Sequence, residues 1–281
     1  MEDTRKLTEG MHRLTQTERR NRLKALCGLE NEELRVLSGE NALPTDISEH
    51  LIENVIGFFP MPLGVATNFT IDGRDLLIPM AVEETSIVAA ASATAKWVRR
   101  EGSIRTFMEG NLIIGQIQLP SVQDPVRTKR ILNENRQMLI EFANLCLPGL
   151  LRRGGGVRDI EIRELSGDGL GEGMLVLHVL CDPCDAMGAN LINQVCEALK
   201  PKIGELTGDR VGLCILSNLV DTKLAHAEVI IHNIDPEIGE GIVEATSFAK
   251  VDPYRAATHN KGVLNGIDPI LIATGNDWRA V

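Results

Sequence analysis

Aromatic and basic residues are the scarce classes in this chain of 281 residues. Phe, Trp and Tyr make up only 3% of it, so few rings are available on which nucleobases can stack. Lys and Arg number 29 against 39 Asp and Glu, which gives a formal net charge of −10. Binding to a phosphate backbone needs clustered basic residues. We therefore expect no nucleic acid among the partners of this protein.

Long apolar runs and the pattern of a secretory leader are also missing. No window of the sequence approaches the ~18 apolar residues that cross a bilayer. The opening segment Met1–Arg5 carries mixed charge, and no apolar core follows it. The six cysteines are scattered along the chain, which favours reduced thiols. We expect a cytoplasmic protein that makes no membrane contact.

The spacing of cysteine and histidine gives no metal-binding motif. Cys181 and Cys184 form one C-x-x-C pair, and a zinc site needs a second pair of Cys or His at a compatible spacing. His226 and His232 have no third ligand nearby in the sequence. We predict no metal. Two half-buried thiols at a strand end are the simpler interpretation of the cysteine pair, with a redox or metal role as the alternative.

Three common catalytic motifs are absent as well. The sequence contains no G-x-x-x-x-G-K-[ST] phosphate loop, no G-x-S-x-G elbow and no H-E-x-x-H pair. The glycine-rich residues 167–173 do not match G-x-G-x-x-G, and they lie between two expected strands. We interpret them as a hairpin loop.

Apolar residues at 43% and charged residues at 24% are the proportions of a compact globular chain. The first fifty residues have a helical, charged pattern, with a break at Pro44 and a short helix expected over 46–57. Asp-Gly at 72–73 lies between two strand-like runs and predicts a hairpin. The small Ala and Ser side chains over 83–97 predict a helix that packs closely against a neighbour.

The hydrophobic pattern is more regular from residue 112 to 216. It predicts, in order, a strand, a helical region, two strands, a helix and a strand, over 112–119, 123–147, 157–165, 174–181, 185–206 and 210–216. This is the β-α-β-β-α-β order of a ferredoxin-like unit. Beyond it we expect a strand at 225–232, a helix at 236–248, and a loop-rich end with a short strand at 270–273. The predicted fold class is α+β.

One polar segment lies at the start of the helix expected over 185–206. Backbone N–H groups at a helix start attract phosphate, and Gly188 lets a ligand approach closely. An N-cap role for Asp185 explains the same residues equally well.

Two further polar segments lie near the end of the chain. Arg255, Asn260, Lys261 and Asn265 gather in an expected loop, which suits an anion or oxyanion site, with a solvated loop as the alternative. Asp277 follows the short strand expected at 270–273, a position typical of catalytic groups and of helix caps alike.

Several segments also follow one another in a set order along the chain. They are Glu53–Gly57, Pro62–Thr67, Glu83–Ser92, Asp185–Asn190, and His259–Gly262 with Gly275–Arg279. Together they resemble hydroxymethylglutaryl-coenzyme A (HMG-CoA) reductase, and the soluble class II branch of that family matches best. The resemblance extends from about residue 10 to the last residue.

The resemblance implies a large domain of mixed helices and strands into which a ferredoxin-like (β-α-β-β-α-β) cofactor-binding domain is inserted. It assigns residues 1–110 and 221–281 to the large, substrate-binding domain. Residues 111–220 become the small, dinucleotide-binding domain. It also implies a homodimer or higher homo-oligomer, because in the family the active site forms between two subunits.

The activity implied is that of an NAD- or NADP-dependent oxidoreductase without a metal. Family members reduce HMG-CoA in two hydride steps to mevalonate and CoA, or run the reverse oxidation. Carried over by position, Lys261 stabilises the oxyanion. Glu84 supplies a proton, which requires a raised pKa from burial beside another carboxylate. Asp277 hydrogen-bonds both groups and sets their protonation.

The resemblance also assigns binding residues. Ser86, Arg255 and Asn265 match positions that hold the hydroxymethylglutaryl carboxylate and hydroxyl. The positions that match the family's nicotinamide dinucleotide site are Asp185, Met187, Gly188, Asn190 and Asn218.

Two departures from the family pattern stand out. An NADH-preferring relative is expected to have an Asp ahead of the triple glycine 154–156, where this chain has Leu147. The neighbouring Arg152 and Arg153 suit the 2′-phosphate of NADP or are solvated charges, so the cofactor preference stays open.

The second departure is the end of the chain. Family members continue past the Asn-Asp-Trp-Arg motif to a C-terminal flap, which carries the histidine thought to protonate the departing CoA thiolate. The sequence given ends at Val281. We expect either a fragment of such an enzyme, or a truncated homologue that binds cofactor or a full-length partner without turnover.

Overall fold

The computed structural model describes residues 9–39, 45–165 and 173–281. The expected break at Pro44 and all but the last residue of the glycine-rich loop at 167–173 lie outside the described residues. The chain divides into two compact units. Unit 1 comprises Met1–Thr106 and Ala227–Val281, and unit 2 comprises Phe107–His226.

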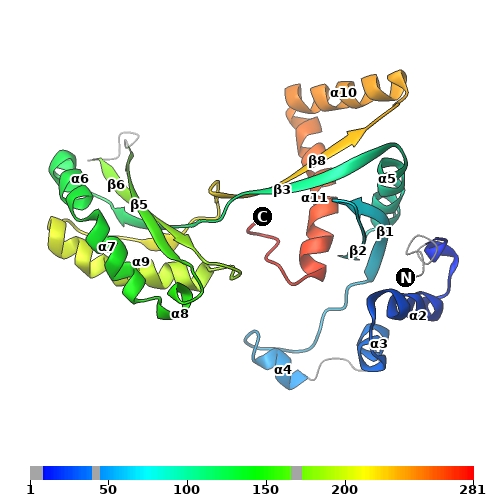
Figure 1. Cartoon of the computed structure of the whole chain (residues 1–281), viewed down its shortest axis with the longest axis horizontal. Helices are drawn as coiled ribbons and strands as arrows, with labels where there is room; N and C mark the ends of the chain where they lie inside the picture. Colours follow the sequence, from blue (N-terminus) through cyan, green and yellow to red (C-terminus); the bar gives the residue numbers. More distant parts are fainter. Residues whose placement is uncertain (1–8, 40–44, 166–172) are drawn as a thin grey trace. The chain divides into compact units, whose positions relative to one another are not determined.

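Unit 1 contains a mixed sheet in the order β2-β1-β3-β8 (Figure 1). Its strands are β1 (Leu63–Ile71), β2 (Arg74–Ala81), β3 (Gly102–Gly110) and β8 (Lys223–Ile231). β1 and β2 pair antiparallel across the Asp-Gly turn at 72–73, so the predicted hairpin is confirmed. β3, which the sequence pattern does not predict, pairs parallel to β1.

Six α-helices and one short 3₁₀ helix accompany this sheet in the described part of unit 1. They are η1 (Met11–Arg13), α2 (Gln16–Cys27), α3 (Asn31–Ser38), α4 (Thr45–Glu49), α5 (Ile87–Glu101), α10 (Pro236–Val251) and α11 (Pro253–Ala273). A capping box between Thr15 and Glu18 starts α2. The helix expected over 46–57 is too long by eight residues, because α4 ends at Glu49.

Residues Pro253–Ala273 form one helix, so the expected loop with a short strand at 270–273 is wrong. Asp252 caps α11 by accepting a hydrogen bond from the Arg255 N–H at 2.8 Å. Pro253 occupies the first helical position, where a missing N–H costs nothing. α11 packs against β2, α5 and α10, so tertiary packing stabilises a sequence that contains Gly262 and Gly266.

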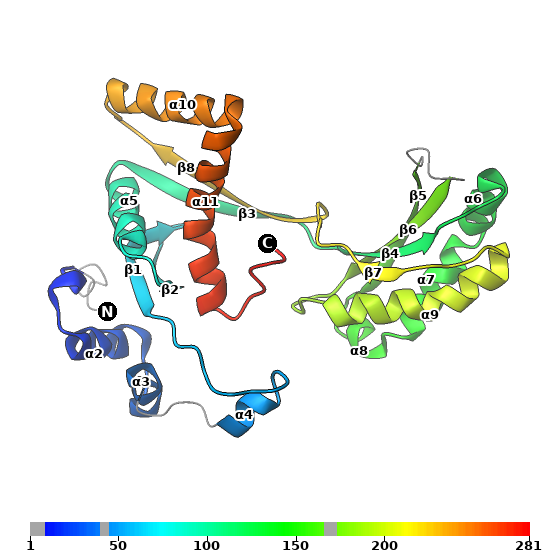
Figure 2. The ribbon, with the colours of Figure 1, turned by 180° about the vertical axis from the view of Figure 1, so that it is seen from behind.

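Unit 2 has the ferredoxin-like arrangement predicted from the sequence. Its elements are β4 (Ile113–Leu119), α6 (Pro125–Glu134), α7 (Arg136–Leu145), α8 (Pro148–Leu151), β5 (Gly156–Leu165), β6 (Met174–Asp182), α9 (Ala189–Thr207) and β7 (Cys214–Leu216). The strands form one antiparallel sheet in the order β5-β6-β4-β7. Helices α6, α7 and α9 lie over one face of it (Figure 2). The last strand is shorter than expected, since residues 210–213 are not in a strand.

The two units differ in how much apolar surface they bury. In unit 2, Leu175, Leu177, Val179 and Leu199 belong to one continuous hydrophobic core, and each is fully buried. In the described part of unit 1, the buried hydrophobic side chains are few, namely Ala66, Met80, Ala81, Ala95, Val98 and Pro269. Helix α10 has no buried residue at all. Within the described residues, no helix is long and apolar enough to cross a membrane.

Candidate active site

Lys261 and Glu84 meet in unit 1, although 177 residues separate them in the sequence. Glu84 lies in the loop between β2 and α5, and Lys261 lies in the middle of α11. Because α11 packs against β2, the Lys261 ammonium reaches this loop, and Nζ donates to Glu84 Oε2 at 2.7 Å. The side chains are 59% and 48% exposed, respectively. In the single chain Glu84 is thus about half exposed and contacts an ammonium, and a second carboxylate is not among its contacts in the described residues.

Asp277 lies in the turn that follows α11, and its described contacts are made to Arg279. The Arg279 guanidinium donates to Asp277 Oδ1 from Nε at 3.1 Å, and the Arg279 backbone N–H donates to the same oxygen at 3.0 Å. These hydrogen bonds hold the pKa of Asp277 below its ordinary value. The expected hydrogen bonds from Asp277 to Glu84 and Lys261 are not among these contacts.

A large cavity of about 1120 Å³ opens beside Glu84 within unit 1. One wall is formed by residues of η1, α2 and α3, and the other by β1, β2 and one face of α5. Glu84 and Ser86 line it at the N-terminal end of α5. Lys96 and Arg99 line it near the C-terminal end of the same helix.

Among the described residues, the cavity is lined by four cations that the sequence pattern does not identify, namely Arg19, Arg20, Lys96 and Arg99. Helical spacing offers a signal for the last two. Val88, Ser92, Lys96 and Arg99 recur at intervals of four and three residues, so they share one face of α5. Arg19 and Arg20 lie on α2, a helix that makes few contacts with the sheet. The sequence pattern of such a helix does not predict which of its residues line a cavity.

The three expected substrate-binding residues lie on two elements. Ser86 is the N-cap residue of α5, with a left-handed backbone at φ 73° and no capping hydrogen bond from its side chain. Asn265 lies one turn after Lys261 on α11, so the two share a helix face. Arg255 lies in the first turn of α11. Ser86 therefore lies close to Glu84, and Asn265 lies on the same helix face as Lys261.

The residues expected to bind the cofactor lie in unit 2, around the start of α9. This helix begins at Ala189, four residues later than expected, and Gly188 is its N-cap residue. The N-cap interpretation of Asp185 is therefore wrong: Asp185 lies in an exposed turn. Met187 and Asn190 flank Gly188 with exposed side chains, and Asn218 is an exposed residue that follows β7.

Gly188 has no room for a side chain. Its φ is 88°, and an added Cβ would lie 2.5 Å from Ile113 Cδ1 and 3.1 Å from Pro183 Cβ. The first turn of α9 contains no acidic residue. Its backbone N–H groups and helix dipole thus suit an anion such as the pyrophosphate of a dinucleotide.

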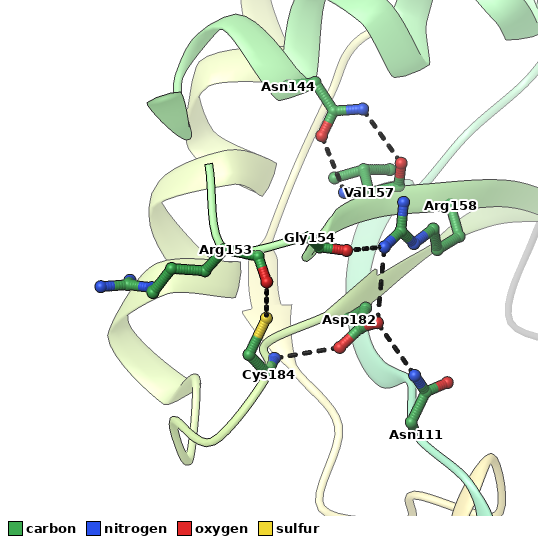
Figure 3. A network of polar contacts seen from close by, with 8 residues as sticks. All are labelled: Asn111, Asn144, Arg153, Gly154, Val157, Arg158, Asp182 and Cys184. Atoms are coloured by element: carbon green, nitrogen blue, oxygen red, sulfur yellow. Dashed lines mark hydrogen bonds and ion pairs between the residues drawn. The ribbon is translucent and has the colours of Figure 1, made fainter. Parts of the chain in front are cut away.

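The triple glycine 154–156 packs against the turn that leads into α9. An added Cβ on Gly155 would lie 2.6 Å from the Asp182 carbonyl oxygen and 2.8 Å from Cys184 Sγ. Figure 3 shows Asp182 between the two turns, where its carboxylate accepts from the Cys184 N–H and from Asn111 Nδ2, each at 2.9 Å. The Arg158 guanidinium donates to the Gly154 carbonyl and lies 3.5 Å from Asp182.

Arg152 and Arg153 lie at the end of α8, immediately before the triple glycine, and both are exposed. The Cys184 thiol donates to the Arg153 carbonyl, with the atoms 3.6 Å apart, while the Arg153 guanidinium extends away from the network (Figure 3). Leu147, which stands where an Asp is expected in an NADH-preferring relative, is buried.

All six cysteines are free in the structure. Burial raises the pKa of the Cys181 and Cys196 thiols to about 12, and that of Cys214 to about 11. Among the described residues, no three His, Cys, Asp or Glu side chains gather as a metal-binding group.

These pKa values predict selective alkylation of the native protein. Thiolates are the reactive form, so we expect iodoacetamide at mildly alkaline pH to modify the exposed Cys27 and to spare Cys181, Cys196 and Cys214. Peptide mass spectrometry over time measures this, and a urea-unfolded sample, in which all six should react, is the control. Equal rates for Cys181 and Cys27 in the native protein would contradict the prediction.

Comparison with known proteins gives one consistent match. The family model described as hydroxymethylglutaryl-coenzyme A reductase matches residues 15–281. The chain is 45% identical over 275 residues to the 3-hydroxy-3-methylglutaryl-coenzyme A reductase of Archaeoglobus fulgidus, covering 97% of this chain and 62% of that protein. It is 32% identical to a probable reductase of the same name from Borreliella burgdorferi, covering 84% of this chain and 55% of the relative.

Solved structures agree with these sequence matches. The 3-hydroxy-3-methylglutaryl-coenzyme A reductase of Streptococcus pneumoniae superposes with a TM-score of 0.91 at 37% identity, covering 97% of this chain and 75% of the other. A class II structure from the same organism, described as bound to NADPH in open conformations, gives a TM-score of 0.89 at 36% identity, with the same coverage of both chains.

Proposed function

Because the chain belongs to the hydroxymethylglutaryl-coenzyme A reductase family, we propose that it reduces the HMG-CoA thioester to mevalonate and CoA, or catalyses the reverse oxidation, with NAD(P)H. The observation that carries this proposal is the 2.7 Å contact between Lys261 and Glu84 beside a cavity of about 1120 Å³. This contact brings an ammonium and a carboxyl group together at a place where the thioester carbonyl of the substrate can bind.

Each side chain has a distinct role in this proposal. Lys261 Nζ donates to the carbonyl oxygen of the substrate and stabilises the negative charge that develops there. Glu84 supplies a proton to the oxygen of the aldehyde as the alcohol forms. Asp277, which Arg279 holds ionised, adds negative charge after α11 and orients Arg279. Ser86, Arg255 and Asn265 bind the hydroxymethylglutaryl group.

The cavity suits the coenzyme A part of the substrate. One face of α5 runs from Ser86 at its N-cap to Arg99 in its last turn, and its 15 residues span about 22 Å. A ligand that lies along this face has its reactive end at Glu84 and its far end near Lys96 and Arg99. Those two cations match the phosphate groups at the far end of a CoA thioester.

Unit 2 suits the dinucleotide. In this proposal the N–H groups at the start of α9 bind the pyrophosphate, and Gly188 allows the left-handed backbone that precedes them. The remainder of the cofactor would be held by the residues expected around this helix start, namely Asp185, Met187, Asn190 and Asn218. Bound NAD(P)H supplies the hydride for each of the two reduction steps. The residues of this chain position the cofactor.

We expect Arg152 and Arg153 to favour NADPH over NADH, because guanidinium groups pair with a 2′-phosphate. The double variant Arg152→Ala/Arg153→Ala should weaken NADPH binding on the order of tenfold and leave NADH binding nearly unchanged. Fluorescence titration with each nucleotide measures both constants. Arg130→Ala, which removes an exposed arginine of α6, is the control. An equal loss for both nucleotides would contradict the assignment.

A homo-oligomer is part of the proposal. Helix α10 exposes a large apolar surface, and at least half of the Ile238, Ile242 and Phe248 side chains is exposed. Exposed apolar side chains in such number on one helix are typical of an interface with another protein. Sedimentation equilibrium of the purified chain reports the number of subunits.

The first test mixes the purified chain with HMG-CoA and either NADPH or NADH, and follows oxidation of the reduced nicotinamide. Calorimetric titration with CoA runs in parallel. Oxidation with mevalonate as product supports the proposal. Binding of CoA without oxidation identifies a homologue that binds without turnover. The absence of both from a folded chain contradicts the assignment of the cavity.

A further inference from the structure

Asn68 has an unusual backbone conformation in the wall of the unit 1 cavity. Its φ is 72°, in the left-handed region that few residues other than glycine adopt. It lies in β1 where the pairing with β2 shifts register between Ala66 and Phe69, so the strand bulges there. Asparagine tolerates this conformation better than most side chains.

Three hydrogen bonds join the bulge of β1 to α5, and a fourth lies within the bulge. The Thr67 N–H donates to Ser92 Oγ at 3.0 Å, and Asn68 Nδ2 donates to the Ser92 carbonyl at 3.1 Å and to Thr67 Oγ1 at 3.2 Å. About two turns further along α5, Arg99 NH2 donates to Asn68 Oδ1 at 3.0 Å. The side-chain amide of Asn68 therefore forms hydrogen bonds with both a backbone carbonyl and a guanidinium group of α5.

Arg99 keeps most of its hydrogen-bonding capacity for something else. A guanidinium has five N–H donors, and the contacts of the described residues use one of them, on Asn68. No carboxylate pairs with Arg99 among the ion pairs of the described residues. Arg99 is half-buried and lines the cavity, as does Lys96 one turn before it. Arg99 is therefore a cation whose position is fixed by Asn68 and whose charge is not neutralised by a carboxylate of the described residues.

We propose that Asn68 is a positioning residue that orients Arg99 toward the phosphate groups of a CoA thioester. This inference rests on the proposed function, which puts that ligand in the cavity. A guanidinium that is already fixed loses less conformational freedom when phosphate binds. A neutral amide oxygen provides the anchor without cancelling the charge, which a carboxylate at the same position would do.

The test compares CoA with pantetheine, which lacks the phosphate groups, by isothermal titration of the purified chain. Asn68→Gly retains the left-handed backbone and removes the anchor, and Asn68→Asp retains the anchor and pairs Arg99 with a negative charge. Both variants should weaken CoA binding on the order of tenfold. Both should leave pantetheine binding within about twofold of wild type.

Two controls separate this role from a general effect on folding. Asn233→Gly changes an exposed asparagine with φ 52° that does not line the cavity, and it should leave both ligands unaffected. In an Arg99→Met background, Asn68→Gly should have no further effect on CoA affinity, because Asn68 acts through Arg99.

Three results would overturn the inference. They are CoA affinity within about twofold of wild type in both Asn68 variants, an equal loss for CoA and pantetheine, or an undiminished effect of Asn68→Gly in the Arg99→Met background. A wild-type chain that binds neither ligand would instead refute the assignment of the cavity to coenzyme A, and this inference with it.

Discussion

Lys261→Met is expected to lower turnover of HMG-CoA by about 10²–10³-fold, the usual cost of removing one donor to a developing oxyanion. Methionine retains most of the length and the apolar stem of lysine but offers no proton to the carbonyl oxygen. Because the Lys261–Glu84 pair is about half exposed, the pair itself contributes little to stability. We therefore expect the melting temperature and the affinity for CoA to stay close to those of wild type.

The measurement is steady-state oxidation of reduced nicotinamide with saturating HMG-CoA, together with a thermal melt and a CoA titration. Lys250→Met is the matched control, since it removes an exposed lysine from the last turn of α10. Turnover of Lys261→Met within about threefold of wild type would exclude Lys261 as the oxyanion donor. A loss of CoA binding equal to the loss of turnover would assign Lys261 to ground-state binding instead.

Gly188→Ala is expected to impair nucleotide binding. The added Cβ would lie 2.5 Å from Ile113 Cδ1, and φ at this position is 88°. Either the Ile113 side chain or the start of α9 must shift, and a shift of the helix start would move the N–H groups proposed to bind the pyrophosphate. We expect a loss of about 1–3 kcal/mol in unfolding free energy. NADPH affinity should fall at least about tenfold.

Gly208 supplies a matched control at the other end of the same helix. It also has a left-handed backbone, at φ 77°, but a Cβ there meets nothing within 4 Å. Gly208→Ala therefore isolates the backbone strain, about 1–2 kcal/mol, from the steric clash. Urea unfolding and NADPH titration of both variants measure the two effects. Equal NADPH affinity in the two variants would show that the space around Gly188 is not used by the nucleotide.

The regular part of the fold could be predicted from sequence, and α11 shows where such prediction stops. Gly262, Gly266 and Pro269 are residues that interrupt isolated helices, so the segment was expected to be a loop. In the structure this helix lies against β2, α5 and α10, and Pro269 is buried. Packing contacts of this kind depend on distant segments and are invisible in a local pattern.

The remaining errors have the same physical origin. β3 was missed because most of its residues are exposed and show no alternation, and because its pairing partner β1 is defined only in the folded chain. The helix start at Ala189 was expected at Asp185, since an N-cap Asp is the commoner choice and a left-handed Gly188 cannot be read from sequence. The pairing of Glu84 with Lys261 came from family resemblance alone, since no spacing rule joins residues so far apart.

The insertion of unit 2 between the two parts of unit 1 sets an order of events during synthesis. As the ribosome moves along the message, Glu84 emerges first, then all of unit 2 with its own hydrophobic core, and Lys261 last. Domains generally fold as they emerge. An incomplete chain released before α11 thus carries the whole of unit 2 but only one partner of the Lys261–Glu84 pair. The Lys261–Glu84 pair can therefore form only after the whole of unit 2 has been translated.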